Sequence, residues 1–276
     1  ALVMRRALEY VKAFDGVIAQ HAQEPRLTEG AQMNEGELSS QLGLAGWPAV
    51  AEEAIIARDV LLAEHVGARL HICHLSTAGS VEIVRQAKAR GVKVTAEVTP
   101  HHLLLTEDLA KTYNAVYKVN PPLRTNEDVL ALRDALVDGT IDIIATDHAP
   151  HPAESKDCEW SSAAFGMVGL ETAASVAQMV LIESKKSDWQ RLADVLSHSP
   201  ARIAGDTTQG FPLEVGAPAN ITLINANVNR TIVAKTASKS SNNPYATLEL
   251  PGSVVHTIYR GYFTVRDGVL AAKGRA

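Results

Sequence analysis

Two histidines and one aspartate, His21, His74 and Asp147, each stand where a short apolar run of the chain ends. Each run has the length and composition of a buried β-strand. Burying a carboxylate such as that of Asp147 costs several kcal/mol unless a cation or hydrogen-bond donors meet it. An acid at the end of a packed strand therefore predicts a catalytic or metal-binding role.

Neutral imidazole and carboxylate are the ligands that zinc and related divalent ions use in catalytic sites. A bound metal lowers the pKa of a water molecule to about 7, and a neighbouring carboxylate can accept its proton and pass it to a leaving nitrogen. A single histidine at a strand end often does no more than form hydrogen bonds with polar groups of the adjacent loop. Two histidines and an aspartate at equivalent ends of neighbouring parallel strands favour a metal site, with His21, His74 and Asp147 as ligands.

The elements that must position these residues repeat the order helix, then strand, then polar loop. We predict strands that end near His21, His74, Val98 and Asp147, and helices over residues 2–13, 49–66, 80–90 and 126–138. The last helix begins at a Thr125–Asp128 capping box. Alternating units of this kind predict a parallel sheet with helices outside it. Four strands cannot close a (β/α)8 barrel, which needs eight strands and about 250 residues.

The composition changes after about residue 205, where helical patterns give way to short β-rich runs between glycines and prolines. We predict strands at residues 219–225, 230–234, 254–260 and 263–267. The predicted fold class is α/β, a partial TIM-type (β/α)8 barrel with a C-terminal β module. Residues 1–204 are expected to form the C-terminal half of the barrel, and residues 205–276 a small β-rich module that is part of a β-sandwich.

The bulk composition excludes several classes of function. The chain has a net charge of −5, which argues against binding to nucleic acid or to an anionic membrane. Its most apolar stretch, residues 173–182, is about half the length that spans a bilayer. Two cysteines, Cys73 and Cys158, are too few for a disulfide scaffold and suit a reducing cytoplasm. We therefore expect a cytoplasmic protein.

Six local sequences occur in a characteristic order along the chain. They are Gln-His-Ala-Gln-Glu at 20–24, His-Ile-Cys-His-Leu-Ser-Thr at 71–77, Glu-Val-Thr-Pro-His-His-Leu at 97–103, Val-Asn-Pro-Pro-Leu-Arg at 119–124, Thr-Asp-His-Ala-Pro-His at 146–151 and Phe-Gly-Met-Val-Gly-Leu-Glu-Thr at 165–172. In this order they resemble bacterial dihydroorotase of the long type, in the amidohydrolase superfamily. Residues 238–245 resemble part of that family's C-terminal β module, so the resemblance covers essentially the whole chain.

The resemblance implies a zinc-dependent cyclic amidohydrolase that interconverts dihydroorotate and N-carbamoyl-L-aspartate in de novo pyrimidine biosynthesis. Two zinc ions occupy the family's complete active site. His21 and His74 resemble the histidines that hold the more exposed zinc. Asp147 resembles the carboxylate that ligates the more buried zinc and serves as general base and then acid.

The same resemblance implies the substrate contacts. Asn120 and His151 correspond to side chains that bind the substrate's ring and carboxylate, and Phe165 and Gly166 to backbone contacts. Residues 152–164 would form a mobile loop over the substrate. The expected partner is this small molecule, and a homo-oligomer or association with other pyrimidine-pathway enzymes stays open.

Histidines and cysteines outside this set are expected to have supporting roles. We predict that His71 points to the face opposite Cys73 and contributes to packing, and that Cys73 points away from the metal. His101 and His102 follow a strand end and are candidates for partners that orient the metal ligands.

The chain departs from the family pattern in its ligand set. The family has a His-x-His pair on the first strand of the barrel and a bridging carboxylate, from Asp or carbamylated Lys, on the fourth, and no His-x-His occurs in these 276 residues. We expect these ligands to lie upstream of Ala1, in a longer enzyme of which this chain is the C-terminal portion, inactive by itself.

Two alternatives remain. A hydantoinase or allantoinase would share the metal site, although the local sequences at 119–124 and 146–151 favour dihydroorotase. A non-catalytic dihydroorotase-like subunit would serve as an assembly partner. The retention of His21, His74 and Asp147 argues against such a scaffold, which needs none of them.

Overall fold

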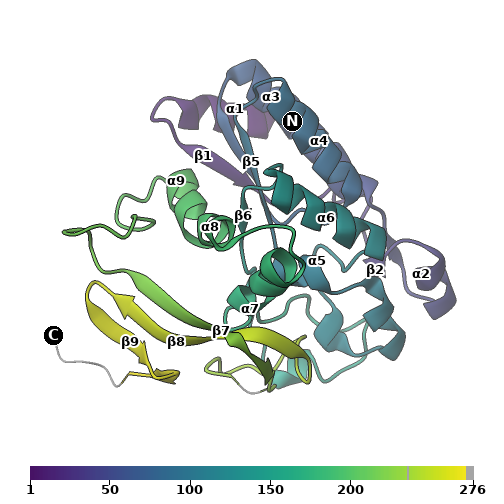
Figure 1. Ribbon diagram of the computed structural model, residues 1–276. Helices are drawn as coiled ribbons and strands as arrows, with labels where there is room; N and C mark the ends of the chain where they lie inside the picture. The colour runs from purple at the N-terminus through teal and green to yellow at the C-terminus, as the bar shows by residue number, and fades with distance from the viewer. Residues whose placement is uncertain (235, 272–276) are drawn as a thin grey trace. The chain divides into compact units, whose positions relative to one another are not determined.

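The computed structural model describes residues 1–234 and 236–271, which form two compact units (Figure 1). The first unit contains residues 1–171 and 234–244. The second contains the described parts of residues 172–233 and 245–276. The domain boundary predicted after residue 204 rests on the change in composition. The two compact units are groups of residues in mutual contact, so that boundary stays a prediction.

The first unit is built on a parallel sheet in the order β1-β4-β5-β6. Its strands are β1 (Val17–Gln20), β4 (Arg69–Ile72), β5 (Val94–Val98) and β6 (Ile143–Ile144). Each strand is preceded by a helix, namely α1 (Leu2–Lys12), α3 (Val50–Val66), α4 (Ala78–Ala89) and α6 (Asn126–Asp138). These helices pack side by side in chain order (Figure 1). The predicted parallel α/β architecture is confirmed.

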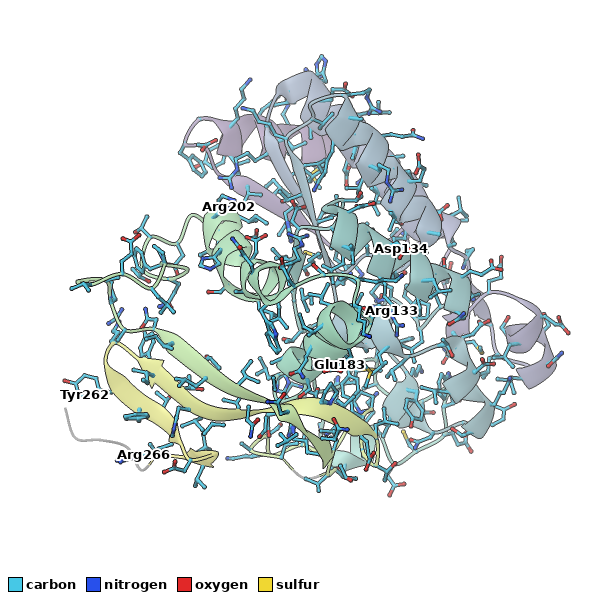
Figure 2. The ribbon with its side chains drawn as sticks, in the orientation of Figure 1. Arg133, Asp134, Glu183, Arg202, Tyr262 and Arg266 are labelled. Carbon is cyan, nitrogen blue, oxygen red and sulfur yellow. The ribbon has the colours of Figure 1, made fainter. Side chains whose placement is uncertain are left out.

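Shorter elements fill the connections of this unit. They are β2 (Met33–Asn34), α2 (Glu37–Leu42), β3 (Gly46–Trp47), α5 (Pro100–Leu104) and the 3-10 turns η1 (Glu107–Thr112), η2 (Ala115–Tyr117) and η3 (Ala153–Ser155). Strands β2 and β3 pair with each other in parallel. The connections are also tied by side chains: Arg133 on α6 donates from Nε to the carbonyl of Leu103 at 2.6 Å (Figure 2).

Local sequence explains where helix α6 begins and ends. The Thr125 hydroxyl accepts a hydrogen bond from the backbone N–H of Asp128, and the Asp128 carboxylate accepts one from the backbone N–H of Thr125. Gly139 follows the helix with a φ of 86°, a left-handed conformation that glycine adopts without strain. The predicted capping box is confirmed.

Removal of this cap gives a first testable prediction. Thr125→Ala leaves a helical N–H without its acceptor and is expected to lower the free energy of unfolding by about 1 kcal/mol. Urea denaturation followed by circular dichroism measures the change. Thr207→Ala, at an exposed position outside helices and strands, is the matched control and should change the stability by less than about 0.5 kcal/mol. Equal stabilities of the two variants would contradict the role of the cap.

The second unit combines short helices with an antiparallel sheet in the order β10-β9-β8-β7. Its elements are α7 (Ala173–Gln178), the π-helical turn η4 (Met179–Glu183), α8 (Trp189–Ala193), the π-helical turn η5 (Asp194–His198), α9 (Ser199–Ala204), β7 (Ile221–Thr231), β8 (Glu249–Tyr259), β9 (Tyr262–Arg266) and β10 (Val269–Leu270). The two strands predicted at 219–225 and 230–234 are one strand, β7, with a register shift between Asn225 and Asn229. Among the described residues, no helix is both long enough and apolar enough to cross a bilayer.

Candidate metal and substrate site

His21 and His74 meet at the carboxyl edge of the parallel sheet. His21 directly follows β1 and His74 lies two residues beyond β4, and these two strands are paired neighbours. The Nδ1 atom of His21 lies 2.8 Å from the Nε2 atom of His74. The structure thus brings together two imidazoles that are separated by 53 residues.

Asp147 follows β6 at the same edge of the sheet. Its carboxylate is near enough to act on the pKa values of both His74 and Cys73. Asp147 and His74 have φ values of 44° and 37°, a left-handed conformation that is uncommon for residues other than glycine. Backbone strain of this kind clusters at functional sites, where it aims a side chain that regular strand geometry would send elsewhere.

The surroundings of His74 and the hydrogen bonds of His21 suit metal binding. Burial, and next the neighbouring His21, lower the pKa of His74 against the opposing effect of Asp147, so that its imidazole is neutral at pH 7. The Nε2 atom of His21 lies 2.9 Å from the side-chain oxygen of Gln23, which can only accept. With the His21 proton on Nε2, His21 Nδ1 accepts a hydrogen bond from His74 Nε2–H, and a metal bound between the two rings would take the place of that proton. Neutral imidazoles with converging nitrogens are the form in which histidine binds a metal.

Gln23 is a site residue that the sequence analysis missed. Its side-chain oxygen accepts hydrogen bonds from His21 and, at 3.1 Å, from Nδ2 of Asn120. Gln23 therefore links a predicted metal ligand to a predicted substrate-binding residue 97 positions further along the chain. The Oδ1 atom of Asn120 is buried and has no hydrogen-bond partner among the described residues. It is an acceptor that a ligand N–H can fill.

His151, Phe165 and Gly166 also lie together. The Nε2 atom of His151 donates to the carbonyl of Phe165 at 2.8 Å. A Cβ atom at Gly166 would approach that same Nε2 to 2.8 Å, and the φ of Gly166 is 133°. Only glycine fits this position, because any larger residue would be strained and would displace His151.

Asn242 is a second residue that the sequence analysis did not assign to the site. Its Nδ2 atom donates to the carbonyls of Ala149 and Gly166, at 2.9 and 3.2 Å. Its Oδ1 accepts from the backbone N–H of His151 at 3.3 Å. Asn242 thus fixes both predicted substrate-binding segments. From the sequence alone, Asn242 is recognised only within residues 238–245, which resemble part of the family's C-terminal β module.

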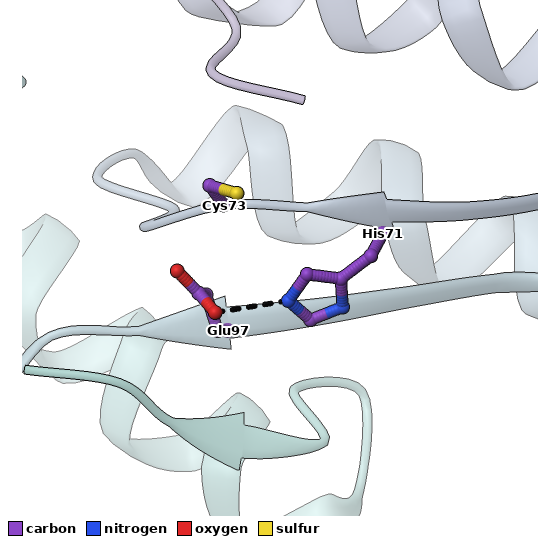
Figure 3. Close-up of side chains that lie close together, drawn as sticks. All are labelled: His71, Cys73 and Glu97. Atoms are coloured by element: carbon purple, nitrogen blue, oxygen red, sulfur yellow. Dashed lines mark hydrogen bonds and ion pairs between the residues drawn. The ribbon is translucent and has the colours of Figure 1, made fainter. Parts of the chain in front are cut away.

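A second cluster of potential metal ligands lies beside the histidine pair. The ligand atoms of His71, Cys73 and Glu97 are all within 4.8 Å of one another (Figure 3). The prediction that His71 and Cys73 point to opposite faces is wrong, because side chains two residues apart along a strand share a face.

The side chains of this cluster are held by hydrogen bonds, and its charges affect the pKa of the Cys73 thiol. The two nitrogens of His71 contact Thr95 Oγ1 at 2.8 Å and Glu97 Oε2 at 2.9 Å, and Glu97 Oε1 accepts from the backbone N–H of His74 at 3.3 Å. Burial, followed by Glu97 and Asp147, raises the pKa of the Cys73 thiol to about 12. In the metal-free protein the Cys73 thiol therefore stays protonated at pH 7, and Glu97 is the member of the cluster that holds the His74 backbone.

His101 and His102 are both buried on α5. His102 contacts Thr99 Oγ1 through Nδ1 at 2.8 Å, and its Nε2 lies 3.2 Å from the carbonyls of Pro121 and Pro122. His102 therefore anchors the segment that carries Asn120. Burial and the charge of the nearby His74 both lower the pKa values of His101 and His102.

Comparison with known proteins shows which proteins this chain is similar to. A family model described as dihydro-orotase-like matches residues 1–80. The dihydroorotase of Streptomyces coelicolor is 66% identical over 271 residues, which cover 98% of this chain and 63% of that protein. The chain is homologous to the bacterial dihydroorotases. The dihydroorotase of Mycobacterium tuberculosis is 51% identical over 272 residues, which cover 98% of this chain and 63% of that protein. The chain thus spans less than two thirds of the length of these dihydroorotases.

The chain is also similar in fold to solved structures of hydantoinases. An L-hydantoinase from Arthrobacter aurescens matches 98% of the chain and 61% of its own length, with a TM-score of 0.86 and 26% identity. A D-hydantoinase from Thermus sp. matches the same shares with a TM-score of 0.84 and 25% identity. The predicted amidohydrolase-type partial barrel with a C-terminal β module is confirmed.

Proposed function

We propose that this chain carries the active-site portion of a zinc-dependent cyclic amidohydrolase that interconverts dihydroorotate and N-carbamoyl-L-aspartate. The 66% identity to a dihydroorotase supports the choice of reaction. One observation carries the proposal: the Nδ1 atom of His21 lies 2.8 Å from the Nε2 atom of His74, at the sheet edge that also presents Asp147. The reaction is assigned to de novo pyrimidine biosynthesis in the cytoplasm.

The donor set fits a divalent metal. His21 through Nδ1 and His74 through Nε2 would hold one ion, and the carboxylate of Asp147 would ligate a second, with further ligands needed to complete both. When bound, zinc supplies a Lewis acid for the ring carbonyl and lowers the pKa of a water molecule. Gln23 orients His21 by accepting its Nε2 proton, as partners of metal-binding histidines commonly do.

The remaining site residues would bind and orient the substrate. The unpartnered Oδ1 of Asn120 can accept from a ring N–H of dihydroorotate. His151 would contact the substrate carboxylate, and the backbone of Phe165 and Gly166 would line the ring. In the hydrolytic direction Asp147 accepts a proton from the attacking water and delivers it to the ring nitrogen as the amide bond breaks.

A substrate panel tests the proposed reaction against the hydantoinases that share the fold. We expect the zinc-loaded complete gene product to hydrolyse dihydroorotate at least about 100-fold more efficiently, by kcat/KM, than hydantoin or allantoin. A preference for hydantoin would identify a hydantoinase, and the absence of turnover on all three would favour a non-catalytic assembly subunit. Since no His-x-His pair occurs in these 276 residues, we expect the chain by itself to hold fewer than two tightly bound zinc ions.

A further inference from the structure

Lys118 and Lys156 are buried in the first unit, with 2% and 8% of their surface exposed. Within the described ranges, neither ammonium group has a carboxylate within the 4.0 Å of an ion pair. Burying an ammonium group without a counter-charge is costly, and lysine is rarely buried in this way. The reason for keeping two such groups must lie in what they contact.

The ammonium of Lys118 contacts the loop that was predicted to cover the substrate. Its Nζ atom donates to the carbonyls of Trp160 and Ser161, at 2.7 and 3.2 Å. The same atom lies 4.5 Å from the centre of the Phe165 ring, a cation–π contact. Lys118 therefore fixes both the loop and the orientation of Phe165.

Lys156 makes the reciprocal connection from within the loop. Its Nζ atom donates to the carbonyls of Ala115, Lys118 and Ala164, at 2.9, 3.0 and 2.7 Å. The Lys118 carbonyl also accepts from the backbone N–H of Gly166 at 2.9 Å. The two ammonium groups thus tie the loop to the segment that leads directly into Asn120.

We propose that Lys118 and Lys156 are positioning residues that hold the Phe165–Gly166 backbone and Asn120 in one fixed geometry for substrate binding. This role rests on the proposed function, because it assigns the substrate to these segments. A methionine of similar length would fill the same space but would leave the backbone carbonyls unpaired. Burial, and next the Lys118 ammonium, lower the pKa of Lys156 to about 8, which reflects the cost of keeping this charge inside the protein.

The test replaces each buried lysine in the complete, zinc-loaded protein. For Lys118→Met and Lys156→Met we expect KM for dihydroorotate to rise at least 10-fold while kcat changes by less than about 3-fold, because substrate binding and not proton transfer is disturbed. Hydrogen–deuterium exchange of the peptide spanning residues 160–166 should accelerate at least 10-fold. Lys111→Met removes the same charge from an exposed lysine and should change neither quantity.

Conservative substitution separates positioning from general stability. Lys156→Arg retains hydrogen-bond donors and a charge, and should restore part of the lost exchange protection. Unchanged exchange at residues 160–166 in both methionine variants would overturn the proposal, as would a fall in kcat with no change in KM.

A measurement on the unmodified chain covers the case in which a methionine variant does not fold. Under native conditions acetylation should modify Lys156 at least about 10-fold more slowly than the exposed Lys111, because its Nζ atom is enclosed by three carbonyls. Equal rates at the two lysines would overturn the proposal. The exchange readout does not depend on activity, so a protein that fails to bind dihydroorotate would refute the proposed function and leave the loop-positioning result to be judged separately.

Discussion

Asp147→Asn is expected to lower kcat for dihydroorotate hydrolysis in the complete protein by on the order of 10²–10⁴-fold, the range typical for loss of a general acid–base group. The amide has nearly the shape of the carboxylate but cannot accept the proton of the attacking water or pass it to the ring nitrogen. Each tenfold loss corresponds to about 1.4 kcal/mol of activation free energy. Steady-state kinetics on the zinc-loaded variant measures the change.

The control for Asp147→Asn is the same substitution at an exposed surface position. Asp108 forms an exposed ion pair with Lys111, so Asp108→Asn should retain the activity of the unmodified protein. The circular dichroism spectrum and thermal midpoint of Asp147→Asn should match those of the unmodified protein, because the side chain is exposed. A variant with near-normal kcat would remove Asp147 from its assigned role.

Loss of His74 is the second substitution with a large expected effect. His74→Ala should weaken zinc binding by more than about 100-fold, because losing even a partner that orients a ligand costs 10–100-fold in affinity. Competition with a chromogenic chelator measures the dissociation constant. His65→Ala, at an exposed position on α3, should leave the affinity unchanged.

Cys73→Ala distinguishes the two neighbouring clusters in the same titration. If His21 and His74 hold the metal, removal of the Cys73 thiol should change zinc affinity far less than His74→Ala does. Zinc binding that survives His74→Ala but is abolished by Cys73→Ala would place the metal in the cluster of His71, Cys73 and Glu97 instead.

The chain's local patterns predicted the elements that position the site. The capping box at Thr125 and the stop at Gly139 define α6, and the apolar runs before His21 and His74 form neighbouring parallel strands. Because parallel strands present their carboxyl ends at one edge, the convergence of these two histidines follows from the order of elements alone.

Contacts between distant segments could not be predicted in this way. Gln23 reaches Asn120 across 97 positions and Asn242 reaches Gly166 across 76, and neither pairing has a periodic signature in the sequence. The buried lysines were also missed, because lysine is usually exposed and only the structure shows Lys118 and Lys156 enclosed by backbone carbonyls.

X-ray absorption at the zinc edge of the zinc-loaded protein tests most directly whether zinc binds at the sheet edge that presents His21, His74 and Asp147. The account predicts nitrogen and oxygen neighbours at about 2.0–2.2 Å, with the outer-shell pattern of imidazole rings. It also predicts that His74→Ala lowers the amount of bound zinc and the number of imidazole neighbours per ion. A sulfur neighbour at about 2.3 Å, which only Cys73 among these clustered side chains can supply, would contradict it.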